Sequence, residues 1–170
     1  MSRIHPKNPY DPQVDSSLKE LKTKLGFTPN IFQLMGHSKA MFMGFTSFSK
    51  YLEQSHLSPK IREAIALCVA GFNSCAYCTA AHTKIAAGCG ISAKEIALNL
   101  GGKSEDKKIA HLLQFCIKIL EKRGHIPSSE IEMLLHQGVR EEELIEIVGV
   151  IALNITTNMF NNVFTPVVDF

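Results

Sequence analysis

The chain has 170 residues, enough for one domain with a sizeable core and too few for two comfortable ones. Hydrophobic residues make up 45% and charged residues 20%, the formal net charge is +2, and the 18 basic residues are spread along the chain. Since no basic run reaches five residues, this composition argues against nucleic-acid binding and against binding to an anionic membrane surface.

The N-terminal residues have no apolar segment followed by a cleavage site, which argues against a secretory signal. The longest apolar run covers residues 64–72, which is too short to span a bilayer. We therefore expect a cytoplasmic protein. In such a reducing compartment, cysteines three apart indicate redox chemistry or a metal site more often than a structural disulfide.

Residues 1–14 are rich in proline and polar groups and are expected to form an N-terminal arm of a single domain that covers residues 1–170. Helical periodicity then recurs along the chain, with residues 27–30 ("FTPN") as a turn and residues 72–74 as a loop that leads into a helix ending near Gly88 and Gly90. The other stretches with helical patterns are residues 14–26, 37–54, 57–73, 91–102, 106–124, 126–138 and 140–164.

Several of these helices have a recognisable start. Ser38, Ser58 and Ser92 are expected as N-caps, and Asp15 or Ser16 is expected as the N-cap of the first helix. No stretch has the pattern of a strand pair or a hairpin. The sequence predicts an all-α domain of about seven or eight helices.

The segment "NSCAYCTAAH" (residues 73–82) carries the chemistry. With Asn73 or Ser74 as the N-cap of a helix, Cys75, Cys78 and His82 fall on one stripe of its surface. The helix N-terminus favours Cys75 as the thiolate, whereas the nearby imidazole of His82 favours Cys78, so spacing alone leaves the order of attack open. Two sulfurs at this spacing can also close a disulfide.

Glu63 lies on the preceding helix, twelve residues before Cys75, among apolar neighbours on the same face. A buried carboxylate needs a partner. A tight turn between the two helices would bring Glu63 close to His82, where it would orient the imidazole ring for proton transfer. Tyr77, between the two cysteines, is a candidate auxiliary hydrogen-bond donor.

Glu63, Cys75, Cys78 and His82 together form a pattern that resembles the alkylhydroperoxidase D family, within the carboxymuconolactone decarboxylase-like superfamily. The stretch "LGFTPNIFQLMGHSKAMFMGF" and the closing "NMFNNVFTPVVDF" are similar to its peroxidase-related branch. The resemblance covers most of residues 20–170, and its most specific part is a redox core at residues 57–90. Better-known members have a histidine immediately before the second cysteine, where this chain has Tyr77.

The resemblance implies an all-helical bundle that assembles as trimers or hexamers and reduces organic hydroperoxides, or the disulfide of a partner peroxiredoxin, without a metal or other cofactor. It also implies that Cys78 is the attacking thiolate, that Cys75 resolves the intermediate, and that Glu63 and His82 form a proton relay. Electrons would come from an external dithiol or a lipoyl-type donor.

Two alternatives have no redox turnover. Cys75, Cys78 and His82 could supply three zinc ligands, with Cys89 or Glu63 as the fourth, although three ligands on one helical stripe suit a tetrahedral ion poorly. The cysteines could also belong to a purely structural helical assembly module. The remaining cysteines, Cys68, Cys89 and Cys116, lie in apolar helical contexts and are expected to be small core residues.

Overall fold

Nine α-helices make up the part of the chain described by the computed structural model, residues 2–170, and no strand occurs within it. This confirms the all-α prediction. The helices are α1 (Pro12–Leu25), α2 (Asn30–Met35), α3 (Lys39–Leu52), α4 (Pro59–Phe72), α5 (Ala76–Gly88), α6 (Ala93–Leu100), α7 (Lys107–Lys122), α8 (Ser128–His136) and α9 (Glu141–Phe164).

Local capping explains most of these boundaries. The hydroxyls of Ser38, Ser58 and Ser92 accept from backbone N–H groups in the first turns of α3, α4 and α6, as predicted. The start of α1 was predicted wrongly. Asp11 caps this helix and Pro12 opens it, so the arm ends at residue 11 rather than residue 14.

The helix that was not predicted from the sequence is α2, which begins at Asn30, the last residue of the predicted turn. Six residues are too few to form a stable helix alone, so α2 depends on tertiary contacts. Ile31, Leu34 and Met35 are buried, and the backbone N–H of Ile31 donates to the hydroxyl of Tyr77 on α5.

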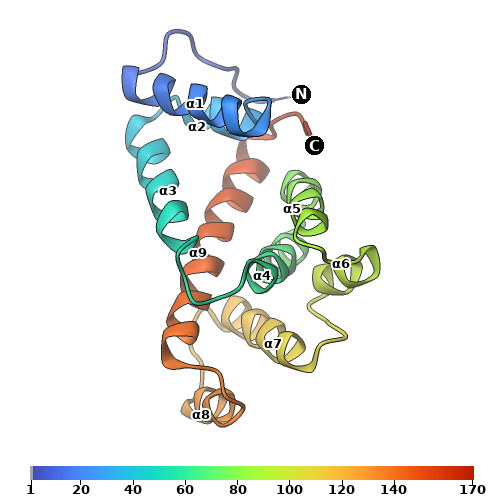
Figure 1. Cartoon of the computed structure of the whole chain (residues 1–170). Helices are drawn as coiled ribbons and strands as arrows, with labels where there is room; N and C mark the ends of the chain where they lie inside the picture. Colours follow the sequence, from blue (N-terminus) through green and yellow to red (C-terminus); the bar gives the residue numbers. More distant parts are fainter. Residues whose placement is uncertain (1) are drawn as a thin grey trace.

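Two long helices organise the molecule. In Figure 1, α9 runs from the end near α8 to the end where both termini lie, with α3 on one side of it and α4, α5 and α6 on the other. α4 packs against α5, α6, α7 and α9. Gly71 of α4 lies so close to the Leu100 carbonyl oxygen that a Cβ there would overlap it, which explains why this contact needs glycine.

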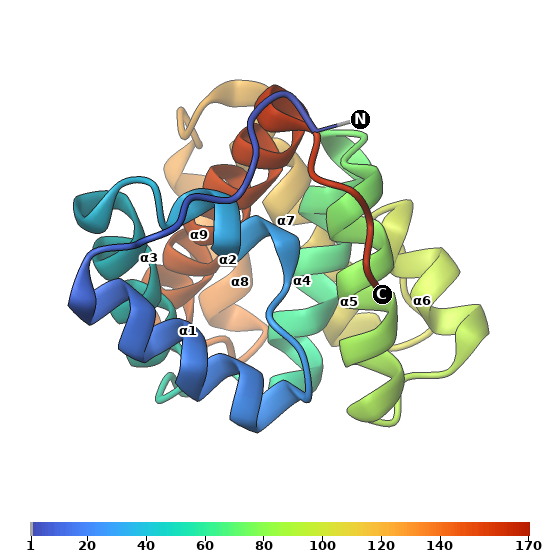
Figure 2. The same cartoon turned by 90° about the horizontal axis from the view of Figure 1, so that it is seen from above.

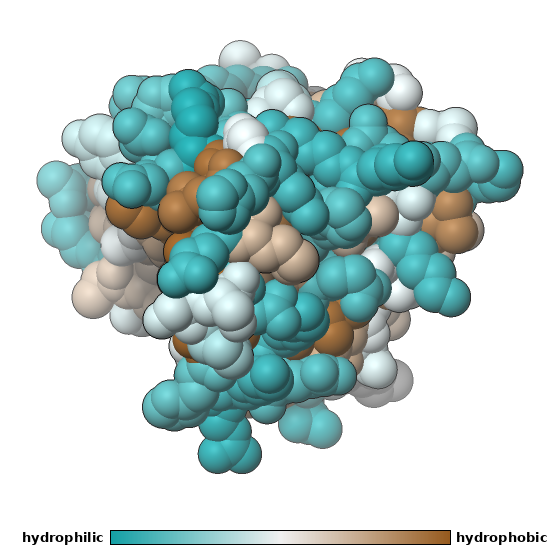
Figure 3. Space-filling view, turned by 90° about the horizontal axis from the view of Figure 1, so that it is seen from below, coloured by the Kyte–Doolittle hydropathy of each residue, from teal (hydrophilic) through white to brown (hydrophobic). Residues whose placement is uncertain are grey.

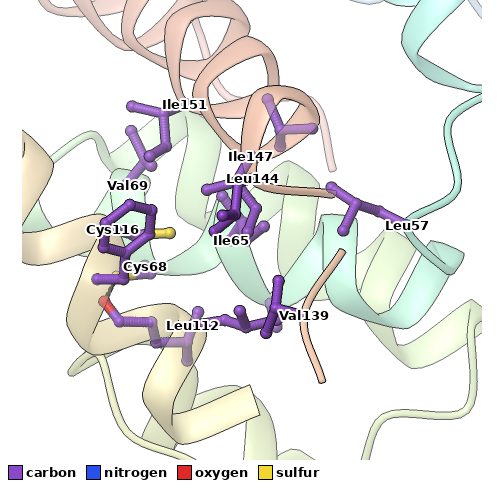
Figure 4. Close-up of a cluster of buried hydrophobic side chains, with 14 of the residues drawn as sticks. Leu57, Ile65, Cys68, Val69, Leu112, Cys116, Val139, Leu144, Ile147 and Ile151 are labelled. Atoms are coloured by element: carbon purple, nitrogen blue, oxygen red, sulfur yellow. Dashed lines mark hydrogen bonds between the residues drawn. The ribbon is translucent and has the colours of Figure 1, made fainter. Parts of the chain in front are cut away.

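The main core lies between α4, α7 and α9 (Figure 4), where Cys68 and Cys116 sit among aliphatic side chains. Among the described helices, α9 is long and apolar enough to cross a membrane by length and composition. Its Leu144, Ile147, Val150 and Ile151 are core residues, which accounts for part of that composition, since 39% of the apolar stretch is buried in the protein. Seen from below in Figure 3, the surface is mainly hydrophilic with separate, small hydrophobic areas.

Candidate active site

The cysteine pair lies at the turn that joins α4 to α5. α4 ends at Phe72, and Asn73 and Ser74 form the turn, with Ser74 in the left-handed region at φ 51°. The N-cap of α5 is Cys75 itself, one or two residues later than predicted, and its sulfur accepts from the backbone N–H of Cys78 at 3.2 Å. The helix N-terminus therefore acts directly on the sulfur of Cys75.

Cys75 and Cys78 are joined by a disulfide. Both residues are buried, with exposed fractions of 1% and 2%. They differ in access, because Cys78 lines a cavity of about 780 Å³ and Cys75 is not among the described residues that line it. Cys78, but not Cys75, is therefore part of the wall that a molecule in the cavity would contact.

Glu63 on α4 and His82 on α5 are hydrogen-bonded, with 2.8 Å between Glu63 Oε2 and His82 Nδ1. This confirms the proximity predicted from the apolar face on which Glu63 lies. Both side chains line the same cavity as Cys78. A carboxylate at Nδ1 favours the tautomer that carries its proton there, which leaves Nε2 available to accept a proton.

The cavity has one reactive side and one apolar side. One face of α5 lines it with Tyr77, Cys78, Ala81, His82, Lys84 and Ile85, and Cys89 follows at the end of this helix. Cys89 is thus a half-buried wall residue rather than the small core residue expected. Four phenylalanines from separate segments also line the cavity: Phe27, Phe32, Phe45 and Phe170.

The α9 wall was not predicted. Asn161 of α9 donates from Nδ2 to the sulfur of Cys78 at 3.2 Å. The asparagine-rich end of this helix is visible in the sequence, but 83 residues separate Asn161 from Cys78. Only the packing of α9 beside α5 brings them together.

Tyr77 anchors the C-terminal segment over the site. Its hydroxyl donates to Asp169 Oδ1 at 2.7 Å, and its ring packs edge-on against Phe170. Burial raises the pKa of Tyr77, and the hydrogen bond to Asp169 raises it further, so the hydroxyl stays a neutral donor. Figure 2 shows the C-terminal segment crossing over α5. The proton of the Tyr77 hydroxyl is therefore already donated to the C-terminal segment.

Cys68 and Cys116 are core residues, as expected. Burial raises the pKa of the Cys68 thiol to about 11 and raises that of Cys116 well above its usual range. Within residues 2–170, no group of three or more His, Cys, Asp and Glu side chains is arranged to hold a metal ion.

Comparison with known proteins gives one family and one fold. Residues 38–106, which include Glu63, both site cysteines and His82, match the model of the carboxymuconolactone decarboxylase family. No curated protein matches the sequence.

Solved structures of similar fold include an uncharacterised peroxidase-related protein from Ralstonia eutropha JMP134, described as an alkylhydroperoxidase AhpD core. It has 20% identity and a TM-score of 0.91, over 99% of this chain and 92% of that chain. A peroxidase-related protein from Silicibacter sp. TM1040 has 21% identity and a TM-score of 0.84, over 98% of this chain and 95% of that chain.

A third similar structure is the debrominase Bmp8, solved as a cysteine-to-alanine variant in complex with 2,3,4-tribromopyrrole. It has 20% identity and a TM-score of 0.81, over 99% of this chain and 94% of that chain. At these sequence identities, the similarity to the three structures shows a shared fold and nothing further.

Proposed function

Since the chain belongs to the carboxymuconolactone decarboxylase-like superfamily and has its alkylhydroperoxidase D-like fold, we propose that it is a thiol-dependent oxidoreductase whose Cys75–Cys78 pair reduces organic hydroperoxides. The observation that carries this proposal is the meeting of Cys78, His82 and Glu63 at one cavity, with Cys75 bonded to Cys78 behind it.

The oxidative half of the cycle starts from the dithiol. His82 takes the proton of the Cys78 thiol, and the thiolate attacks the terminal oxygen of the hydroperoxide. The O–O bond breaks, the alkoxide takes the proton from His82 and leaves as an alcohol, and Cys78 becomes a sulfenic acid. Glu63 stabilises the positive charge that His82 carries between these two proton transfers.

Cys75 then resolves the intermediate. Its thiolate attacks the sulfur of Cys78, the hydroxyl leaves as water after gaining a proton, and the disulfide forms. In sum, one hydroperoxide and two thiols become one alcohol, one water and one disulfide. The access of the cavity to Cys78 supports Cys78 as the attacking residue and Cys75 as the resolving one.

An external dithiol completes the cycle. Its thiolate attacks Cys78 from the cavity, and Cys75 leaves as a thiolate held by the backbone N–H of Cys78. The second thiol of the donor then attacks the mixed disulfide and frees Cys78. A small dithiol or a lipoyl-type arm suits a buried sulfur, and in the cytoplasm the same dithiol could pass electrons to the disulfide of a peroxiredoxin.

Aryl-halide reduction is a second candidate. The aromatic side of the cavity, with Phe27, Phe32, Phe45 and Phe170, supports a flat aromatic substrate. The debrominase Bmp8, which has the same fold, was solved with a brominated pyrrole. In this reaction the dithiol and the aryl bromide become the disulfide, the debrominated ring and hydrogen bromide.

A homo-oligomer, a trimer or hexamer, is part of the proposal. Ile145, Val148, Ala152, Met159 and Val163 fall on one stripe of α9 and are exposed, Ile145 by 73% and Met159 by 64%. An apolar stripe of this length is typical of a surface that a second copy covers. Light scattering on the eluting protein measures the mass, and a monomer at micromolar concentration contradicts this part of the proposal.

Turnover with a dithiol and cumene hydroperoxide tests the function. We expect hydroperoxide consumption in the wild type and in Cys89→Ser, and none in Cys78→Ser. Activity that survives in Cys78→Ser excludes the assignment of Cys78. Bromide release from a brominated pyrrole, without hydroperoxide consumption, favours the second candidate. About one zinc per chain in protein purified without chelator, and no turnover, favours the structural alternative.

A further inference from the structure

Three asparagines on α9 are buried on one face of the helix. Asn154, Asn158 and Asn161 lie at i, i+4 and i+7 on one stripe of the helix and are 5%, 0% and 4% exposed. Asn154 donates to the backbone of its own helix. Asn158 accepts from Asn73 of the α4–α5 turn, and its own Nδ2 has no hydrogen-bond partner among the described residues. Asn161 is different, because its partner is the sulfur of Cys78.

The pairing of Asn161 is incomplete. Its Nδ2 lies 3.2 Å from the Cys78 sulfur, while its Oδ1 is fully buried and has no hydrogen-bond partner among the described residues. A buried acceptor without a partner costs stability, so a leucine of similar size would serve the fold at least as well. An asparagine at this position is better explained by the hydrogen bond that its side-chain N–H donates to the Cys78 sulfur.

We propose that Asn161 is a catalytic residue, whose amide N–H stabilises the thiolate of Cys78 in the reduced protein. A sulfur in a disulfide is a weak acceptor, whereas a thiolate carries a full charge and accepts a much stronger hydrogen bond. The donor is already in place before the charge forms, which is the condition for electrostatic stabilisation without reorganisation. The inference rests on the proposed function, because it assigns a further residue to the same thiol cycle.

Charged groups lie on the other walls of the cavity. The ionisable side chains that line the cavity are Glu53 just after α3, Arg62 and Glu63 of α4, Tyr77, His82 and Lys84 of α5, and Cys89 just after α5. Asp169 accepts a hydrogen bond from Tyr77. α9 contributes to the cavity wall only neutral residues, within the described part of the chain. Asn161 therefore acts as a fixed dipole, whose effect persists across the whole pH range.

The test is the pH dependence of Cys78 alkylation in a Cys75→Ser background, which prevents disulfide formation and keeps a capping side chain at position 75. Iodoacetamide labelling from pH 5 to 10, about one value per half unit, is measured on the peptide that contains Cys78 by mass spectrometry. We expect Asn161→Leu to raise the apparent pKa of Cys78 by about one to two units and to slow labelling at neutral pH by about 10- to 100-fold.

Two further variants make the test specific. Asn162→Ala removes the neighbouring amide of α9, which donates to the backbone carbonyl of Asn73 in the α4–α5 turn and does not touch sulfur. We expect this variant to leave the pH dependence of Cys78 alkylation unchanged. Asn161→Ala removes the same N–H with a smaller side chain, and it should shift the profile as Asn161→Leu does. The melting temperature of Asn161→Leu should be unchanged or higher, because an unpaired buried acceptor is removed.

Superimposable profiles for Asn161→Leu, Asn161→Ala and their parent overturn the inference, and so does an equal shift in Asn162→Ala. Labelling needs no hydroperoxide and no electron donor. A shifted profile in a protein that consumes no hydroperoxide therefore refutes the proposed reaction alone, while an unshifted profile in an active enzyme refutes the role of Asn161 alone.

Discussion

Glu63 Oε2 and His82 Nδ1 lie 2.8 Å apart, between α4 and α5, and both side chains line the cavity that Cys78 also lines. Nineteen residues separate them, and the short turn at residues 73–75 makes the contact possible. A carboxylate in this position holds the imidazole ring and compensates the charge that the ring gains with a proton.

Glu63→Gln should lower kcat/KM for a hydroperoxide by roughly 10- to 100-fold and shift the pH dependence of Cys78 alkylation. The amide of glutamine can still accept from Nδ1–H, but it does not stabilise an imidazolium ion. Steady-state kinetics and the labelling profile measure the two effects.

The chain offers a matched control for this variant. Glu146 accepts from His56 Nδ1 at 2.9 Å, in a second Glu–His pair that does not line the cavity. Glu146→Gln should leave both measurements unchanged. If Glu63→Gln has the pH profile of the wild type, the two residues are not coupled in the reaction.

The Glu63–His82 pair could be predicted from the sequence because the features that indicate it lie close together along the chain. A carboxylate on an apolar helical face, a short turn, and a histidine in register with two cysteines lie within residues 57–90. The helix starts at Ser38, Ser58 and Ser92 were predictable for the same reason, since capping depends on neighbouring residues.

Contacts between distant segments could not be predicted in this way. Residues 30–35 form α2 only where Tyr77 and the C-terminal segment accept their backbone donors. Asn161 is far from Cys78 in the sequence, and the two meet only because α9 packs beside α5 in the fold. The start of α5 was placed too early because cysteine is an uncommon N-cap, and its capping here depends on the sulfur.

Tyr77→Phe should weaken the attachment of the C-terminal segment to α5. The variant loses a hydrogen bond to the carboxylate of Asp169 and the acceptor for the backbone N–H of Ile31. We expect a loss of about 1 to 3 kcal/mol in the free energy of unfolding, measured by urea denaturation. Hydrogen exchange should become faster in residues 29–32 and 165–170.

Tyr51→Phe serves as the control for this variant, since Tyr51 is 72% exposed. Its free energy of unfolding should change by less than about 0.5 kcal/mol. Equal stability of the two variants would contradict the anchoring role of Tyr77.

Alkaline pH should destabilise the fold through the buried thiol of Cys68. Its pKa is raised from 9.0 to about 11 by burial, so the unfolded chain loses this proton at a lower pH than the folded one. The stabilisation is complete below pH 9 and is lost as the pH rises to about 11, by about 2 to 3 kcal/mol. Urea denaturation between pH 8 and about 11 measures this loss.

Cys68→Ala removes the titrating thiol and provides the comparison. Its stability at pH 8 should be lower, because a buried side chain is shortened. Its further decline toward high pH should be smaller than that of the wild type. A decline of the same size in both proteins would show that the Cys68 thiol is not responsible.

In the proposed reaction, Cys75 and Cys78 exchange electrons with a substrate as one pair. The most direct measurement is the mass of fully reduced protein after one equivalent of an organic hydroperoxide, followed by peptide mapping. We predict the loss of two hydrogen atoms, located in a Cys75–Cys78 disulfide, with Cys68, Cys89 and Cys116 still free. Unchanged mass, or a disulfide that involves any of those three cysteines, would contradict this account.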